Sequence, residues 1–359
     1  MQTPLGQVTR GAKLESPVLG ASSMKLATYV RQGQARAGLV HQDSMIDWVD
    51  AVQALLRERE TASDLGAVRE QLGEGVLGFV ENAGEARPLA DEILARASEG
   101  KSPAGTRLTA LAECELLAPI PRPRSMRDGY AFRQHVETAR KNRGLEMIPE
   151  FDEFPVFYFT NHDAVVGPGP LRVGGRRLER LDFELEAAIV VGKTARNLTT
   201  ATADDTIFGL TIMNDWSARA LQMDEMKLSL GPAKGKDFAT GLGPYLVTLD
   251  ELLPHTKKTD RGLVFDLGMR AWVNGVQLSQ GNVAQMTWTF AQILERVSDG
   301  VNVNPGDVIG SGTCGTGCFL ELNGSKVTDN QWLQPGDRVV LEIDGIGRLE
   351  NVIEADAAS

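Results

Sequence analysis

Cysteine is scarce in this sequence, with 3 residues among 359. An odd number of cysteines cannot pair completely, and neither they nor the 4 histidines have the spacing of a zinc site. These absences favour a reducing compartment, so we expect a cytoplasmic protein. Cys314 and Cys318 lie in one glycine-rich loop, where they could form a redox pair or simply pack in the core.

Long apolar runs and an excess of positive charge are also absent. No run approaches the ~20 apolar residues of a membrane span, and residues 1–23 lack the apolar stretch of a signal peptide, so we expect a flexible extension there. Lys and Arg number 37 against 48 Asp and Glu, which gives a net charge of −11 and argues against non-specific nucleic-acid binding. The glycine-rich loop Leu230–Gly243 does not match G-x-x-x-x-G-K-[ST], so a nucleotide site is not expected.

The chain is long enough for two domains. Residues 24–115 read as strands separated by turns and followed by helices, which predicts a small α/β domain; the helices are expected at Asp47–Arg57, Asp64–Ala83 and Pro88–Ala97. Leu116–Arg124 contains three prolines, which exclude helix and indicate a stiff domain boundary. Residues 116–356 would form the larger domain.

The larger domain is expected to be α+β and rich in strands. Asn274-Gly275 is the strongest hairpin signal in the chain, and two Pro-Gly-Asp turns near the C-terminus each precede a predicted strand, with Cys318–Gly324 assigned to the same turn-and-strand pattern. Further elements are predicted as helices at Tyr130–Arg143 and Met286–Val297 and as strands at Phe154–His162 and Thr206–Asn214.

A pair of carboxylates opens the apolar segment Leu181–Gly192. On a strand, Glu184 and Glu186 point to the same face, where their charges repel unless a cation or proton neutralises them. They therefore indicate either a hard-metal site of oxygen ligands or merely the solvent-exposed face of a half-buried strand. Asp215 ends another predicted strand and is open to two interpretations as well, a site residue or a helix N-cap.

Seven blocks in one order carry a resemblance to a known family. RDGYAFRQH, FPVFY, DFELE, MNDWSAR-x-x-Q, GPAKGKDF, GDVIGSGT and FLELNG, spread between Leu116 and Asn351, resemble the fumarylacetoacetate hydrolase superfamily. The resemblance implies a mixed β-roll catalytic domain behind a small N-terminal α/β domain, a homodimer, and a bound Mg2+, Mn2+ or Ca2+ ion.

The resemblance also implies roles for individual residues. The metal ligands would be Asp128, Glu184, Glu186 and Asp215. His135 would activate water with Glu321 as its carboxylate partner, and Arg219, Gln222 and Lys236 would stabilise the developing oxyanion. Tyr130, Tyr158, Thr313 and, in a less well matched segment, Arg143 would contact the substrate.

The implied reaction is hydrolysis of a carbon–carbon bond in an anionic 1,3-diketo acid of the fumarylacetoacetate or acylpyruvate kind, in the breakdown of aromatic or related compounds. The cation would orient the substrate and act as a Lewis acid. Decarboxylases, isomerases and sugar-acid dehydratases share this scaffold, so the fold alone leaves these alternatives open, together with a non-catalytic relative that binds a ligand through the metal. The segment between Lys141 and Asp152 is either a lid or a surface loop.

Overall fold

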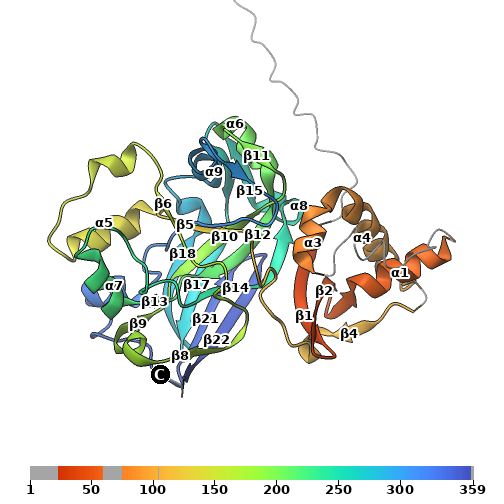
Figure 1. The fold of residues 1–359 in the computed structure, drawn as a ribbon, viewed down its shortest axis with the longest axis horizontal. Coiled ribbons are helices and arrows are strands. Elements are labelled where there is room, and N and C mark those ends of the chain that lie inside the picture. The colour runs from red at the N-terminus through yellow and green to blue at the C-terminus, as the bar shows by residue number, and fades with distance from the viewer. Residues whose placement is uncertain (1–22, 60–74, 104, 357–359) are drawn as a thin grey trace, which may run out of the picture.

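The computed structural model describes residues 23–59, 75–103 and 105–356. Nearly all of the predicted flexible extension, residues 1–22, lies outside the described residues, and so does the first half of the predicted helix Asp64–Ala83. The described chain is α+β and rich in strands, as predicted (Figure 1).

One 11-stranded mixed sheet connects the two predicted domains. Its N-terminal strands join the others where β1 pairs with β14, through Lys25↔Val247 and Leu26↔Leu246. In order across the sheet the strands are β4 (Leu108–Ala110), β3 (Ser44–Asp47), β2 (Gln34–His41), β1 (Lys25–Arg31), β14 (Thr240–Thr248), β12 (Ile207–Asn214), β10 (Leu185–Val191), β20 (Val308–Gly310), β5 (Met126–Gly129) and β6 (Phe157–Phe159), with β7 (Val165–Val166) paired to β14.

A second sheet of five strands packs against the central strands of the first. Leu185, Ala187 and Ile189 of β10 share one hydrophobic core with Ala271 and Leu341 of this sheet. Its strands, in order, are β18 (Val276–Asn282), β17 (Gly268–Val273), β21 (Arg338–Ile343), β22 (Gly347–Ala355) and β8 (Gly169–Val173). Three short ribbons pair β11 (Ala195–Arg196) with β19 (Asn302–Val303), β13 (Ser217–Ala218) with β9 (Leu181–Asp182), and β15 (Thr256–Thr259) with β16 (Gly262–Phe265).

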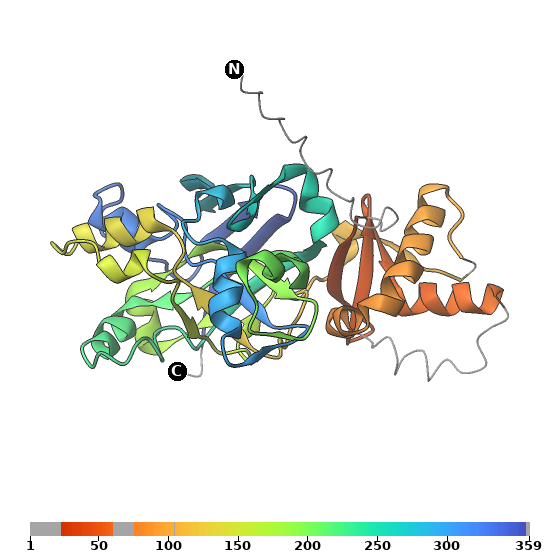
Figure 2. The ribbon, with the colours of Figure 1, turned by 90° about the horizontal axis from the view of Figure 1, so that it is seen from above.

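Helices pack around this two-sheet core (Figure 1). The N-terminal helices gather at one end of the molecule, beside β1 and β2 (Figure 2). Phe79 and Val80 of α3 share a second hydrophobic core with Ala188 and Val190 of β10. The described helices are α1 (Trp48–Glu58), α3 (Val76–Glu81), α4 (Ala83–Ser98), α5 (Arg133–Lys141), α6 (Thr200–Ala203), α7 (Arg219–Met226), α8 (Leu249–Leu252), α9 (Phe290–Ser298) and α10 (Phe319–Gly324).

The hairpin predicted at Asn274-Gly275 is present. Val273 pairs with Val276 across the turn, and both turn residues have the positive φ (51° and 82°) that a two-residue hairpin requires. The helix predicted at Met286–Val297 begins later, at Phe290, because the Thr289 side chain accepts from the backbone N–H of Gln292 and caps it there.

Other predicted elements were wrong in type or extent. Cys318–Gly324 was assigned to the turn-and-strand pattern, but Phe319–Gly324 is helix α10. The cause is a tertiary contact. The Asp182 carboxylate accepts from the backbone N–H groups of Phe319 and Leu320 and so caps the helix, although the local sequence contains no helix-start signal. The last N-terminal helix begins at Ala83 rather than Pro88, which lies inside it, and Phe154–His162 contains only the three-residue strand β6.

Candidate functional site

The two glutamates of the central segment are buried. Glu184 is 6% exposed and Glu186 is 0% exposed. Glu186 lies on β10 and Glu184 immediately precedes it, and β10 lies inside the sheet between β12 and β20 with both faces covered by apolar cores. The interpretation of a solvent-exposed strand face is therefore wrong. Two carboxylates on one buried face need a neutralising partner, since burying an unpaired charge is very costly.

Strand pairing brings two aspartates to the same place. Asp128 on β5 reaches the glutamates because β20 joins β5 to β10, and Asp215 follows β12, whose last residue pairs with Leu185. One oxygen from each of Asp128, Glu184, Glu186 and Asp215 lies within 4.8 Å of the others, and all four residues are buried. Asp215 is not a helix N-cap, because Ala218 holds that position on α7.

Two buried cations border the four carboxylates. The Nζ of Lys236 donates to Glu184 and to Asp215, each at 2.5 Å. The guanidinium of Arg219 donates to Glu184 at 2.7 Å and to the Oε1 of Gln222 at 2.9 Å. Four carboxylates thus face two positive side chains, and the cluster keeps an excess of negative charge.

The excess charge shows in the acid–base properties of the carboxyl groups. Burial, followed by repulsion from Asp215, raises the pKa of Asp128 to about 8, and burial next to Asp128 raises the pKa of Glu186 well above its usual range. Burial alone would raise the pKa of Glu184 too, but Lys236 and Arg219 lower it. Without a cation, the Asp128–Glu186 end of the cluster therefore retains a proton near neutral pH.

The donor set fits a hard divalent cation. All four side chains offer carboxylate oxygen, which suits Mg2+, Mn2+ or Ca2+ better than zinc. The Oδ1 of Asp215 is buried and has no hydrogen-bond partner within the described part of the chain, so it is available to a bound cation. The backbone N–H of Gly312 donates to both Asp128 and Glu186 at 3.1 Å, so their orientation is fixed beforehand.

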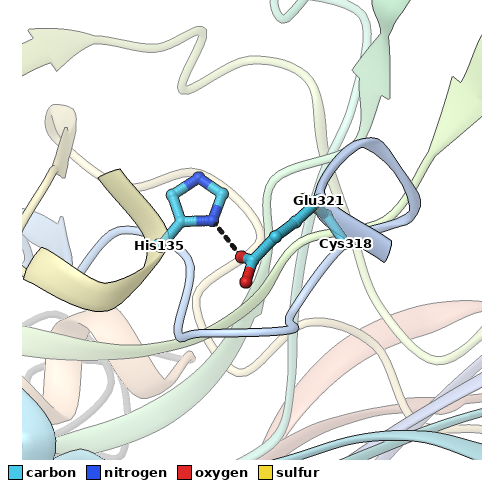
Figure 3. Close-up of side chains that lie close together, drawn as sticks. All are labelled: His135, Cys318 and Glu321. Atoms are coloured by element: carbon cyan, nitrogen blue, oxygen red, sulfur yellow. Dashed lines mark hydrogen bonds and ion pairs between the residues drawn. The ribbon is translucent and has the colours of Figure 1, made fainter. Parts of the chain in front are cut away.

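A buried histidine–glutamate pair lies beside this cluster. The Nδ1 of His135 on α5 is 2.7 Å from the Oε2 of Glu321 on α10 (Figure 3). The backbone N–H of Thr316 donates to the other Glu321 oxygen at 2.9 Å, and the ring of Tyr130 packs edge-on against the imidazole, with 5.9 Å between centroids. The imidazole also lies within electrostatic range of Glu184. The pair is thus held in place from several sides.

The remaining predicted residues divide into two groups. Tyr158 donates its hydroxyl to Asp215, and the hydroxyl of Thr313 donates to Glu186 at 3.4 Å, so both contact the carboxylate cluster itself. Arg143 is exposed, and its Nε donates to the backbone carbonyl of Ala139 at 3.0 Å. It lies outside the carboxylate cluster, but its charge acts on the Tyr130 hydroxyl, and its contact with a substrate stays a prediction.

Sequence reasoning missed Asp182. Its carboxylate is fully buried and accepts from the Nε of Arg219 at 2.8 Å as well as from the N-terminus of α10. It therefore links Arg219, which borders the carboxylate cluster, to the helix that carries Glu321. The signal was available in the DFELE block, where Asp182 stands two residues before Glu184.

Comparisons with known proteins place the chain in a family. The profile described as "Fumarylacetoacetate (FAA) hydrolase C-terminal" matches residues 124–354. The chain belongs to the fumarylacetoacetate hydrolase superfamily, a superfamily of enzymes, and the predicted fold is confirmed by the similarity to solved structures of that family.

Individual relatives differ in their named activities. The oxaloacetate tautomerase YisK of Bacillus subtilis (strain 168) is 29% identical over 335 residues, which cover 92% of this chain and 100% of YisK. A solved fumarylacetoacetate hydrolase from Exiguobacterium antarcticum is 25% identical with a TM-score of 0.66, over 93% of this chain and 100% of that one. A maleylpyruvate hydrolase from Sphingobium sp. SYK-6, solved with manganese(II) and pyruvate, shares the fold at 20% identity and a TM-score of 0.63, over 92% and 99% of the two chains.

Within residues 23–59, 75–103 and 105–356, no helix combines the length and apolar character needed to cross a membrane.

Proposed function

We propose that the chain is a divalent-metal-dependent enzyme that hydrolyses a carbon–carbon bond in a small anionic 1,3-diketo acid. The observation that carries this proposal is the buried His135–Glu321 pair, 2.7 Å apart, beside a cluster of four buried carboxylates. Water activation needs a base oriented by a second group, and the carboxylate cluster alone does not provide one.

The carboxylates Asp128, Glu184, Glu186 and Asp215 would hold the cation. When bound, it would supply Lewis-acid polarisation of substrate oxygens. A bound divalent cation together with the buried groups Lys236 and Arg219 would offset the four carboxylates, so that an anionic substrate can bind here despite the net charge of −11 of the chain.

His135 would carry the proton through the reaction. With its Nδ1–H donated to Glu321, its Nε2 is free to accept a proton from water while the water oxygen attacks the distal carbonyl carbon. Lys236, Gln222 and Arg219 would stabilise the oxyanion that forms. When the carbon–carbon bond breaks, the departing carbon takes a proton and the acyl carbon leaves as a carboxylic acid, so one water is consumed for each bond cleaved.

A second candidate is tautomerisation of oxaloacetate or a similar 2-oxo diacid. The similarity to YisK, which extends over 92% of this chain, favours it. The same residues would serve, but His135 would exchange a proton with the carbon between the two carbonyl groups, and no bond between carbons would break.

Product analysis of wild type and His135→Ala separates the two reactions. The hydrolase proposal expects pyruvate and a free carboxylic acid from acylpyruvates, with a rate about 10²- to 10⁴-fold lower in His135→Ala, the usual contribution of a general base. His162→Ala, at an exposed histidine of the loop after β6, is the matched control and should keep the wild-type rate. Faster conversion of enol to keto oxaloacetate without any acylpyruvate cleavage would instead establish the tautomerase.

The assembly and the domain division are further parts of the proposal. We propose a homodimer, which light scattering of the purified chain tests directly. The division at residue 116 also stays a prediction, since β1 and β14 belong to one sheet.

A further inference from the structure

A second group of metal-binding side chains lies next to the carboxylate cluster and differs from it in chemistry. His135, Cys318 and Glu321 each place one ligand atom within 4.8 Å of the other two, and all three are buried. Figure 3 shows His135 of α5 facing Glu321, with Cys318 at the start of α10 beside it. The set therefore offers one nitrogen, one sulfur and one oxygen.

We propose that His135, Cys318 and Glu321 form a binding site for a thiophilic divalent cation, Zn2+ above all, which inhibits the enzyme when it binds. Imidazole and thiolate are the ligands that zinc prefers, whereas Mg2+ and Ca2+ prefer oxygen. Three protein ligands leave the fourth tetrahedral position to water, the arrangement of an open zinc site. The two neighbouring clusters would thus select different metals.

The geometry needs only small movements to close around the ion. Tetrahedral ligands about 2.0–2.1 Å from zinc lie roughly 3.4 Å apart. The distance of 2.7 Å between His135 Nδ1 and Glu321 Oε2 must therefore increase. The Cys318 sulfur, which lies within 4.8 Å of the other two ligand atoms, must come within bonding distance of the ion. Side-chain rotations provide movements of this size. The ion would replace the Nδ1 proton that His135 donates to Glu321.

The surroundings already fix the ligands. Thr316 donates its backbone N–H to the Glu321 oxygen that faces away from His135, and Tyr130 packs against the imidazole. Cys318 is the N-cap residue of α10 and is fully buried. Outer partners of this kind hold ligands in the orientation that binding requires.

Inhibition follows from the overlap with the proposed base. Zinc bound at Nδ1 leaves the ring proton on Nε2, so Nε2 can no longer accept a proton from water. A Glu321 oxygen bound to zinc also no longer orients the imidazole. The inhibitory consequence rests on the function proposed for His135, whereas the binding of the ion does not. Binding of the ion and inhibition by it can therefore be refuted separately.

Cobalt(II) is a probe that reports sulfur ligation directly. The full-length protein, saturated with Mg2+, is titrated with Co2+ under reducing conditions while the near-ultraviolet thiolate-to-cobalt charge-transfer band is recorded. A cobalt ion in the carboxylate cluster gives no such band, because its ligands are all oxygen. We expect the band at about one equivalent in wild type and its loss in Cys318→Ser.

Cys314→Ser is the matched control. Cys314 is also a buried free cysteine in the same loop, but it does not belong to the three-residue group. The band should persist in this variant, and Zn2+ should bind Cys318→Ser more weakly than wild type by more than about 10-fold, the low end for loss of even an outer-shell partner. No band in wild type, or an equal band in Cys318→Ser, would overturn the proposal.

Zinc-edge X-ray absorption of the wild-type protein needs no variant and covers the case in which Cys318→Ser fails to fold. We expect one sulfur at about 2.3 Å with nitrogen and oxygen neighbours; a shell of oxygen alone would overturn the site. If sulfur is present but Zn2+ leaves turnover unchanged, the metal site stands and the role of His135 as the base is refuted.

Discussion

Replacing Glu186 by Gln should remove most of the stabilisation that a divalent cation gives to this protein. Glu186 is fully buried, and its pKa is raised by burial and by Asp128, so the carboxylate is unfavourable without a cation. Glutamine keeps the shape and the oxygen that accepts from Gly312, but it removes a charge. The metal-free variant should therefore be at least as stable as metal-free wild type.

The size of the effect follows from linkage. A ligand at 100 times its Kd stabilises the folded state by about 2.7 kcal/mol. An unfolding entropy of about 2.1 cal/mol/K per residue over 359 residues amounts to about 750 cal/mol/K, so this free energy raises Tm by about 4 °C. In Glu186→Gln, where the cation binds more weakly, the rise should fall to about 1 °C or less at the same metal concentration.

Differential scanning calorimetry after EDTA treatment, with and without added Mg2+ or Mn2+, measures both quantities. Glu354→Gln, an exposed position on β22, is the matched control and should show the full rise. An unchanged metal-induced rise in Glu186→Gln would refute the assignment of the cation to this cluster. A large loss of stability in the metal-free variant would refute the inference that the buried carboxylates repel one another when no metal is bound.

Two further substitutions test other parts of the structure. Asp182→Asn should lower kcat by about 10- to 100-fold through misplacement of Arg219 and Glu321 while the metal-induced rise in Tm is kept, and an unchanged kcat would exclude a positioning role. At Asp47, burial alone would raise the pKa, but hydrogen bonds from Arg36 and neighbouring groups lower it from 3.8 to about 2. Its stabilisation should therefore be complete above about pH 5 and be lost progressively as the pH falls through the folded pKa of about 2. Urea unfolding should show Asp47→Asn to be less stable by about 1–2 kcal/mol at pH 7, allowing for partly exposed partners, with a difference that shrinks in acid; a difference independent of pH would contradict the assignment.

The carboxylate cluster was predictable because its members sit at strand ends in recognisable blocks. The alternation of a strand places Glu184 and Glu186 on one face. The other two ligands, Asp128 and Asp215, follow from the order of the blocks that resemble the family. What the local pattern could not decide was whether that face was buried. Burial depends on the position of β10 between β12 and β20, a tertiary fact.

The errors have the same origin. FLELNG carries no local sign of a helix start, and α10 forms because Asp182, far away in sequence, caps it. Asp182 stands in the DFELE block, but its partners Arg219, Phe319 and Leu320 are distant in sequence, so its role follows only from tertiary contacts.

The central claim is that turnover of a 1,3-diketo acid depends on a cation held by Asp128, Glu184, Glu186 and Asp215. The most direct measurement is product analysis of an acylpyruvate panel by the purified protein, before and after EDTA treatment and again after Mg2+ or Mn2+ is restored. We expect pyruvate and a free carboxylic acid, lost on chelation and regained with the metal. Cleavage that persists in EDTA, or release of CO2 in place of the carboxylic acid, would contradict it.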